Sequence, residues 1–370
     1  MSAPRSQAPL HLGMIGCGLI SHAHGRAAKT LASEVRFAAC ASRDAERAAA
    51  WGRDYGCDHA YTDYRDMLAR ERLDGVVIAT WPADHRAHIE DCLNAGVRYI
   101  LCEKALTISP EDALAIWHRS RALGAVVMEG FMYRHHPVMD KLSSLVAEGV
   151  IGAVDSINAT FHMFDPESAA ADAADRSWRQ KQETGGGVIH DFLCYPVDAA
   201  NRFAGSLPQR VSAIGFESPC YGTLNRLYGW IGYENGVVAT VESSRKAVFG
   251  QRLVITGDQA ELSLPQAWTI PGDGDITLSR SPGFIQRRSE VIAVPFAEPH
   301  DGRLVDFPVF RRQLANFANV IRGTALPKIS LDESVVNVLT LDALARSVRQ
   351  QTCIDVILPS PLVDAIRQRI

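Results

Sequence analysis

Short apolar runs alternate with amphipathic stretches over the first third of the chain. Strands are predicted at 10–16, 35–42, 75–80, 99–102 and 125–128. Helices are predicted between them, at 21–32, 44–56, 63–69, 83–95 and 109–124. Asp44 and Ser109 are the expected N-caps of two of these helices, which end at Gly56 and Gly124. Regular alternation of strands and helices with short loops predicts a parallel sheet that is covered on both faces.

Beyond about residue 130 the apolar positions recur with a period of two. Strands are predicted at 153–163, 210–217, 226–233, 237–243, 252–256 and 260–264. Asn235-Gly236 separates two of them and is a strong hairpin signal. Helices are predicted at 137–148, 307–322 and 332–350, with Ser330 and Glu333 as a capping box for the last. We expect a loop at 165–176, whereas 266–300 is rich in proline and glycine and predicts no clear element.

The length of 370 residues exceeds what one hydrophobic core usually supports. The pattern therefore predicts an α/β protein of two domains. Residues 1–130 are expected to form a Rossmann-type, doubly wound parallel sheet, and residues 131–370 an α+β domain with a mainly antiparallel sheet. The last long helix, at about 332–350, is expected to pack back toward the first domain.

Composition and charge exclude several classes of function. Hydrophobic residues make up 47% of the chain and charged residues 22%, which is ordinary for a soluble globular protein. A net charge of −4 and a pI of about 6.3 provide no electrostatic footprint for nucleic acid or anionic lipid. No apolar run approaches the ~20 residues of a membrane helix, and the N-terminus has no apolar stretch typical of a signal peptide.

Cysteine and histidine spacing predicts neither a disulfide framework nor a metal site. The eight cysteines include no C-x-x-C pair, and several lie in apolar runs, as buried reduced thiols do. His135-His136 and His85…His88 lack carboxylates at ligand spacing. We therefore expect a cytoplasmic protein without a bound metal that binds neither nucleic acid nor membrane.

A glycine-rich loop follows the first predicted strand and opens the first predicted helix. Its sequence is Gly-Cys-Gly-Leu-Ile-Ser at 16–21, a G-x-G-x-x-G pattern with serine in the last place. The first glycine permits the turn, and the second lets the backbone approach a pyrophosphate at the helix N-terminus. The predicted cofactor contacts in this loop are Gly16, Cys17, Gly18, Leu19 and Ile20. The alternative is an ordinary βα turn, although the strand and helix on either side favour dinucleotide binding.

The end of the second strand carries information on the cofactor. An NAD site usually has an acidic residue here to accept from the ribose 2′-hydroxyl. This chain has Ser42-Arg43 instead, and a guanidinium can pair with a 2′-phosphate and stack on adenine. NADP is therefore favoured over NAD. In the alternative interpretation Arg43 is solvated and Asp44 merely caps the next helix.

Two further segments carry candidate chemistry. Glu103-Lys104 ends a buried strand, at the edge of a parallel sheet where ligands bind. Asp191 and Tyr195 follow three glycines and share one face of a predicted helix at 192–203. A tyrosine beside an ammonium, which lowers its pKa, could move the hydroxyl proton while hydride passes to nicotinamide. The alternatives are a solvated lysine, an N-capping aspartate and a core tyrosine.

Taken together, these motifs resemble the glucose–fructose oxidoreductase / inositol dehydrogenase (Gfo/Idh/MocA) family nearly from end to end. The similar segments are 13–20 with His24, 41–44, Thr80 with His85, 95–104, 129–137, and Trp178-Arg179 followed by Gly-Gly-Gly and Asp191…Tyr195. The block ending in Glu103-Lys104 and the glycine–Asp–Tyr block are far more specific than the glycine loop.

The resemblance implies roles for individual residues. Lys104 would polarise the reacting carbon–oxygen group, Tyr195 would donate or accept the proton, and Asp191 would hold a substrate hydroxyl. Further implied cofactor contacts are Thr80, Trp81, His85, Glu103 and Lys104. Further implied substrate contacts are Arg134, Trp178, Arg179 and His190. The implied substrate is a sugar, polyol or related cyclic compound. The implied second domain has a large open sheet whose exposed face forms a homodimer or homotetramer.

Several positions depart from the family pattern. Trp81 and Pro82 replace its proline and asparagine, Ala105 replaces the proline after Glu-Lys, and Gly130 replaces an alanine. Trp81 could either cover the nicotinamide or plug the interdomain hinge, and Ala105 could loosen the backbone that presents Lys104. Two other functions stay open at this point: a non-catalytic NADP-binding sensor or regulator, and a hydride-assisted lyase or glycosidase with tightly bound cofactor.

Overall fold

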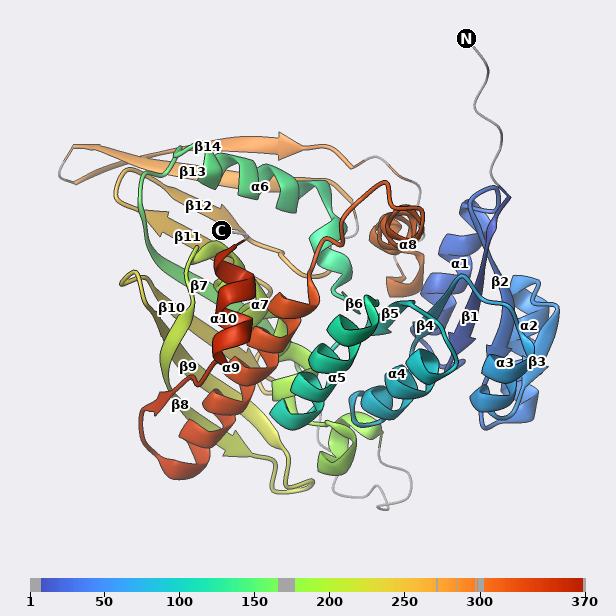
Figure 1. Cartoon of the computed structure of the whole chain (residues 1–370). Coiled ribbons are helices and arrows are strands. Elements are labelled where there is room, and N and C mark those ends of the chain that lie inside the picture. Colours follow the sequence, from blue (N-terminus) through green and yellow to red (C-terminus); the bar gives the residue numbers. More distant parts are fainter. Residues whose placement is uncertain are drawn as a thin grey trace, which may run out of the picture.

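The computed structural model describes residues 8–165, 177–270, 272–283, 285–296, 298 and 303–368. Two β-sheets lie side by side with helices around and between them (Figure 1). The stretch 166–176, most of the loop expected at 165–176, lies outside the described residues.

The first sheet confirms the Rossmann-type prediction. Its six strands are all parallel, in the order β3-β2-β1-β4-β5-β6. They are β1 (Leu10–Ile15), β2 (Val35–Ala41), β3 (His59–Tyr61), β4 (Gly75–Ile78), β5 (Tyr99–Glu103) and β6 (Val126–Gly130). The helices that follow them in turn are α1 (Ser21–Thr30), α2 (Ala45–Tyr55), α3 (Tyr64–Arg70), α4 (His85–Asn94) and α5 (Pro110–Leu123). The sequence pattern missed only β3, which is three residues long and largely exposed.

The capping residues determine where these helices begin and end. Asp44 accepts from the backbone N–H of Arg47 at 3.0 Å, as predicted for an N-cap. Ser109 does the same for Asp112 at 3.2 Å. Gly124 takes a left-handed conformation (φ 59°) and ends α5. Short polar signals thus fixed helix ends that the apolar pattern alone leaves uncertain.

The second sheet has nine strands in the order β14-β13-β12-β11-β7-β10-β9-β8-β15. All its neighbours are antiparallel except β7 and β10, which are parallel. The strands are β7 (Val154–His162), β8 (Pro208–Glu217), β9 (Leu224–Tyr233), β10 (Val238–Ser244), β11 (Leu253–Gly257), β12 (Glu261–Leu264), β13 (Gly274–Gly283), β14 (Gln286–Val294) and β15 (Ile354–Asp355). The Asn235-Gly236 turn joins β9 to β10 as predicted, with Gly236 at φ 89°.

One face of this sheet is covered by helices and the other is not (Figure 1). The helices on the covered face of the sheet are α6 (Pro137–Ala147), α7 (Cys194–Phe203), α9 (Leu331–Gln350) and α10 (Ser360–Arg367). Large apolar side chains on four strands remain exposed: Ile214, Phe216, Trp230, Val238 and Val291. The open sheet that the family resemblance implied is therefore present.

Two helices from the end of the chain return to the first domain. Phe310 of α8 (Pro308–Ile321) packs edge-on against His24 of α1, with ring centroids 5.7 Å apart. The indole N–H of Trp117 in α5 donates to Asp332 of α9 at 2.6 Å. Both helices therefore link the second domain to the first.

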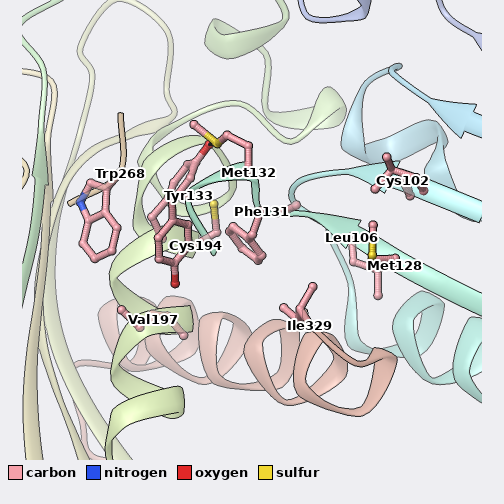
Figure 2. Close-up of a cluster of buried hydrophobic side chains, with 14 of the residues drawn as sticks. Cys102, Leu106, Met128, Phe131, Met132, Tyr133, Cys194, Val197, Trp268 and Ile329 are labelled. Atoms are coloured by element: carbon pink, nitrogen blue, oxygen red, sulfur yellow. Dashed lines mark hydrogen bonds between the residues drawn. The ribbon is translucent and has the colours of Figure 1, made fainter. Parts of the chain in front are cut away.

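The hydrophobic core continues between the two sheets. Figure 2 shows a buried cluster that runs from Cys102 and Met128, in β5 and β6, to Cys194 and Val197 in α7 and to Trp268. These side chains are at most 2% exposed. The cluster lies between the strand that ends just before Lys104 and the helix that carries Tyr195, and it fixes their relative positions.

Candidate active site

The glycine loop between β1 and α1 has the geometry that a pyrophosphate site requires. Gly16 has φ 92°, and a Cβ built on it would lie 2.8 Å from the carbonyl oxygen of Ala79. Apart from its chain neighbours, no atom of the described residues lies within 4 Å of a Cβ built on Gly18, so phosphate oxygens could approach its backbone. The N-terminus of α1 has no side-chain cap, and the N–H groups of Ser21, His22 and Ala23 donate to carbonyl oxygens of the loop 18–20. An anion would therefore be bound by the N–H groups of the loop itself, at the positive end of the helix dipole. The residues present therefore fit a dinucleotide.

The glycine loop borders a cleft of about 600 Å³ formed by the loops after β1, β2 and β4. The predicted cofactor residues that line it are Gly16, Cys17, Gly18, Ser42, Arg43, Thr80 and Trp81. Arg47 and Arg65 line it as well, although the sequence pattern did not single them out. Those predicted cofactor residues that lie outside the lining are Leu19, Ile20, His85, Glu103 and Lys104.

Glu103 is held beneath the glycine loop rather than in the cleft. Its carboxylate lies 2.8 Å from Nε2 of His24 in α1, and both side chains are buried. A Cβ built on Gly130 would lie 3.0 Å from Cα of Glu103 and 3.2 Å from its carboxyl carbon. Glycine at 130, where the family has alanine, therefore leaves room for the Glu103–His24 pair.

His85 and Glu129 support the backbone that follows Lys104. The buried His85 ring lies 3.0 Å from the carbonyl oxygen of Ala105 through Nδ1 and 3.2 Å from that of Thr80 through Nε2. Glu129 accepts from the N–H of Leu106 at 2.8 Å. These contacts hold the segment at 105–106, where the family's proline is replaced and looser backbone was expected.

Lys104 joins the first domain to the second. Its Nζ donates to the carboxylate of Asp191 at 3.0 Å and to the carbonyl oxygen of the same residue at 2.7 Å. Asp191 lies in a π-helical turn, Ile189–Leu193, directly before α7. Pro196, five residues after Asp191, has no N–H to donate to that carbonyl, which therefore accepts from the lysine. The single helix predicted at 192–203 thus begins as a π turn.

Two arginines complete the surroundings of the Asp191 carboxylate. Arg179 donates to Oδ2 through Nε at 3.0 Å, and Arg245 through Nη2 at 2.6 Å. Burial opposes ionisation of Asp191, but the charges of Lys104, Arg179 and Arg245 prevail and lower its pKa to about 2. Arg245 follows β10 and also pairs with Asp165 at 2.8 Å. Sequence analysis missed it, because an arginine after a strand has no distinguishing spacing.

Tyr195 lies next to Lys104, as predicted, but its side chain is more deeply buried than expected. Nζ of Lys104 is 5.2 Å from the centroid of the tyrosine ring, which is 5% exposed. Its hydroxyl donates to Sδ of Met132 at 3.6 Å. Burial raises the pKa of Tyr195 well above its usual value, and nearby Cys194 and Glu103 raise it further. The expected lowering of this pKa by an ammonium is therefore wrong for this structure.

The three glycines hold the turn that bears Trp178 and Arg179. A Cβ built on Gly186 would lie 2.6 Å from the carbonyl oxygen of Lys181 and 2.7 Å from that of Arg179. Gly187 donates its backbone N–H to the same Arg179 oxygen at 2.9 Å. The close approach expected of these glycines is confirmed, and it presses the Arg179 turn against Asp191.

His190 is adjacent to the same centre. Burial, and then the charge of Lys104, lower the pKa of its imidazole to about 4, so the ring is neutral near pH 7. Its Nδ1 has no hydrogen-bond partner among the residues that the structure describes. The structure therefore places His190 beside the predicted catalytic residues as a neutral ring.

Arg134 lies in a buried network of ion pairs and hydrogen bonds. Its side chain is 1% exposed and donates to the buried carboxylate of Asp198 at 2.6 Å and to Glu333 at 3.0 Å. Asp198 also accepts from Tyr133 and from Asn337. The predicted substrate contact thus lies within a buried network that ties the segment after β6 to α7 and α9.

Neither a metal site nor a membrane span is found in the part of the chain that the structure describes. No three histidine, cysteine or acidic side chains there are grouped to hold a metal ion. No helix within the same residues is long and apolar enough to cross a membrane.

A Rossmann sheet with an open glycine loop, joined to a lysine–aspartate–tyrosine cluster, defines a nucleotide-dependent oxidoreductase. Residues 10–131 match the model of the oxidoreductase family with an NAD-binding Rossmann fold, and residues 139–263 match the GFO/IDH/MocA C-terminal domain. The chain belongs to the Gfo/Idh/MocA family of oxidoreductases, as the sequence motifs predicted.

Curated relatives include sugar oxidoreductases. The chain is 31% identical over 321 residues to D-xylose 1-dehydrogenase (NADP(+)) 2 of Haloferax volcanii, covering 85% of this chain and 90% of the relative. It is 32% identical over 216 residues to the dTDP-3,4-didehydro-2,6-dideoxy-alpha-D-glucose 3-reductase of Actinomadura kijaniata, covering 58% and 62%. The first alignment spans most of both proteins.

Solved structures share the fold of the whole chain. Levoglucosan dehydrogenase in complex with NADH superposes with a TM-score of 0.84 at 20% identity, covering 95% of this chain and all of that one. A 3-ketoreductase from Actinomadura kijaniata in complex with NADP and TDP-benzene superposes with a TM-score of 0.78 at 23% identity, covering 92% and 98%. At these identities the likeness shows the two-domain fold and no more.

Replacing Arg134 tests whether it supports the fold or contacts substrate. In Arg134→Met the carboxylate of Asp198 stays buried without its main cation, so the free energy of unfolding should fall by about 3 kcal/mol or more. Chemical denaturation measures this change. Arg210→Met is the control, because Arg210 and its partner Asp355 are 59% and 62% exposed, so loss of that pair should change stability little. Wild-type stability of Arg134→Met with a raised KM would instead assign Arg134 to substrate.

Glu129 should make stability depend on pH. Burial raises the pKa of its carboxyl to about 8, whereas in the unfolded chain it titrates near 4.5. Its contribution to stability is therefore complete below pH 4.5 and is lost as the pH rises through 8. From pH 5 to pH 8 the wild type should lose stability relative to Glu129→Gln, by about 3 to 4 kcal/mol. Parallel pH profiles of the melting temperature would contradict this.

Proposed function

We propose that this protein is an NADP-dependent dehydrogenase or reductase that acts on a hydroxyl or carbonyl group of a sugar, polyol or related cyclic compound. The observation that carries the proposal is the contact of Lys104 with both Asp191 and Tyr195 at the junction of the two domains. The full-length similarity to a D-xylose 1-dehydrogenase supports an aldose as the first substrate to test.

The cluster can bind and orient a substrate oxygen. The nicotinamide, when bound, supplies or accepts the hydride. The ammonium of Lys104 can donate to the oxygen of the reacting carbon–oxygen group and stabilise negative charge there. Three cationic groups donate to the carboxylate of Asp191, which has about four acceptor positions. One position is left to accept from a neighbouring hydroxyl of the substrate.

Tyr195 can move the proton. Since burial raises the pKa of its hydroxyl, the phenol carries its proton near pH 7 and can donate it to a carbonyl oxygen. Its present partner is the thioether of Met132, which is a weak acceptor. Exchanging that contact for a substrate oxygen therefore has little energetic cost. In the direction of alcohol oxidation the Tyr195 hydroxyl must first lose its proton before its oxygen can take the proton of the substrate hydroxyl, so the raised pKa favours reduction near pH 7 and oxidation at higher pH.

Preference for NADP is supported by charge at one end of the cleft. Arg43 and Arg47 line the cleft just after β2, where the 2′-position of the adenosine ribose is bound in this fold. Arg65 of α3 lines the cleft too, but it is paired with Asp91 at 2.9 Å. Asp44 is the nearest acid in sequence, and it is engaged as the N-cap of α2. A 2′-phosphate therefore finds guanidinium groups where a 2′-hydroxyl would find no unengaged carboxylate on that loop.

Two other functions are less well supported. A sensor that binds NADP without catalysis does not need the assembled contacts of Lys104, Asp191 and Tyr195. A hydride-assisted lyase or glycosidase would use the same groups but retain its cofactor between turnovers, so a requirement for added NADP distinguishes it from a dehydrogenase.

Surface and cysteine chemistry support a proposal for assembly and location. The exposed apolar side chains on β8, β9 and β10 form a face suited to self-association, which supports a homodimer or homotetramer. All eight cysteines are free thiols, which suits a reducing compartment such as the cytoplasm.

Replacing the two catalytic candidates should reduce turnover but not cofactor binding. Lys104→Met and Tyr195→Phe should each lower kcat by about 10²- to 10⁴-fold, because each removes a group that acts on the reacting oxygen. The dissociation constant of NADPH should change little. Turnover is followed by NADPH absorbance with D-xylose and a panel of sugars and polyols. Near-normal turnover in both variants would refute the assignment.

Replacing Arg43 should shift the cofactor preference. In Arg43→Gln the affinity for NADPH should fall by about 10- to 100-fold, because a charge-assisted contact to the 2′-phosphate is lost. The affinity for NADH should fall much less, since it lacks that phosphate. Fluorescence titration with both cofactors measures the ratio. Arg53→Gln, on the exposed surface of the helix α2 that follows Arg43, is the control. An unchanged NADPH/NADH ratio would remove Arg43 from phosphate recognition.

A further inference from the structure

Trp81 lies at an unusual place for a large aromatic side chain. It follows β4 at the position where the family pattern has proline, and it is 37% exposed. It lines the same cleft as the glycine loop. The guanidinium carbon of Arg43 lies over its ring, 5.4 Å from the centroid. An indole face and a guanidinium plane are the two surfaces on which nucleobases most readily stack.

The position of this pair identifies which half of a dinucleotide it can meet. Arg43 follows β2 and Trp81 follows β4, and these strands flank β1 on either side in the sheet. The ribose of the adenosine half is bound at the end of the second strand in this fold. Lys104, where the chemistry is expected, follows the next strand, β5. Contact with Arg43 therefore places the Trp81 ring toward the adenosine end of the cleft.

We propose that Trp81 and Arg43 form the two walls of the adenine site and that the base inserts between indole and guanidinium. This proposal rests on the proposed use of a nicotinamide dinucleotide. A planar base needs about 3.5–4.0 Å on each side, or roughly 7–8 Å between its walls. The two walls are 5.4 Å apart in this structure, so Arg43 has to move by roughly 2 Å. Arg43 makes no ion pair or hydrogen bond within the described residues that would hold it back.

The same geometry argues against the two roles that the sequence left open for Trp81. Its neighbour Pro82 makes the contact with the second domain: a Cβ built on Gly185 would lie 3.3 Å from Cβ of Pro82. Pro82, rather than Trp81, therefore fills the space between the two domains at this point. A cover for the nicotinamide would have to lie toward Lys104, whereas Trp81 contacts Arg43 on the β2 side.

The test compares adenosine 2′,5′-bisphosphate, which contains only the adenosine half, with NADPH. Both ligands are titrated by calorimetry into the full-length wild type, Trp81→Ala and Trp81→Phe. Leu326→Ala is the control, since that apolar side chain is 85% exposed and does not line the cleft. Trp81→Ala should weaken both ligands by the same factor, about 5- to 100-fold. Trp81→Phe should restore most of the affinity, and Leu326→Ala should leave it unchanged.

Several results would overturn the proposal. Weaker NADPH binding with unchanged binding of the bisphosphate would place Trp81 over the nicotinamide, and no loss with either ligand would remove it from the site. A phenyl ring that restores nothing would exclude stacking. Should Trp81→Ala fail to fold, the bisphosphate should still quench fluorescence in the wild type more than in Trp81→Phe, and equal quenching would refute the stack. A wild type that binds neither ligand would refute the proposed function itself.

Discussion

The contact between Lys104 and Asp191 is the interaction on which the site depends, because it joins the two domains where the chemistry is expected. The lysine comes from the end of β5 in the parallel sheet, and the aspartate from a π turn that packs against the second sheet. Both side chains are largely buried, so each ion stabilises the other in a poorly solvated environment. If either charge were lost, the remaining one would be costly to bury, and the geometry of the site would relax.

The surrounding residues hold Lys104 and Asp191 in position. His85 and Glu129 fix the backbone after Lys104, while the glycine run presses the Arg179 turn against Asp191. Arg245 adds a third cation, and together the three positive charges keep Asp191 ionised. The cofactor cleft is lined by the glycine loop and by residues that follow β2 and β4. Binding of adenosine and chemistry at the substrate are thereby assigned to different strand ends of one sheet.

Much of the fold could be predicted because local signals agreed with the global pattern. The strands of the first sheet are buried apolar runs, and the Asp44 and Ser109 caps mark where two of its helices begin. The β13–β14 hairpin could not be predicted, because nearly all of β14 is exposed and has no alternation of apolar residues. The π turn at Asp191 could not be predicted from the sequence either, since it depends on the hydrogen bond between its carbonyl oxygen and Lys104 rather than on local propensity.

The candidate site could likewise be predicted only in part. Family-like spacing brought Lys104, Asp191 and Tyr195 together correctly, yet it could not tell that Arg134 would be sealed in a network with Asp198. Nor could it reveal Arg245, which reaches Asp191 from a strand 54 positions further along the chain. The direction of the Tyr195 pKa shift depends on burial, a property of packing that motifs do not contain.

A double-mutant cycle on the rate of hydride transfer tests the central claim most directly. Single-turnover rates would be measured with saturating NADPH and one active sugar for the wild type, Lys104→Met, Asp191→Asn and the double variant. If the two residues act as one unit, the double variant should be little slower than Lys104→Met, with a coupling energy above about 1.5 kcal/mol. Effects that add to within about 0.5 kcal/mol would contradict the account and show that the two residues contribute independently.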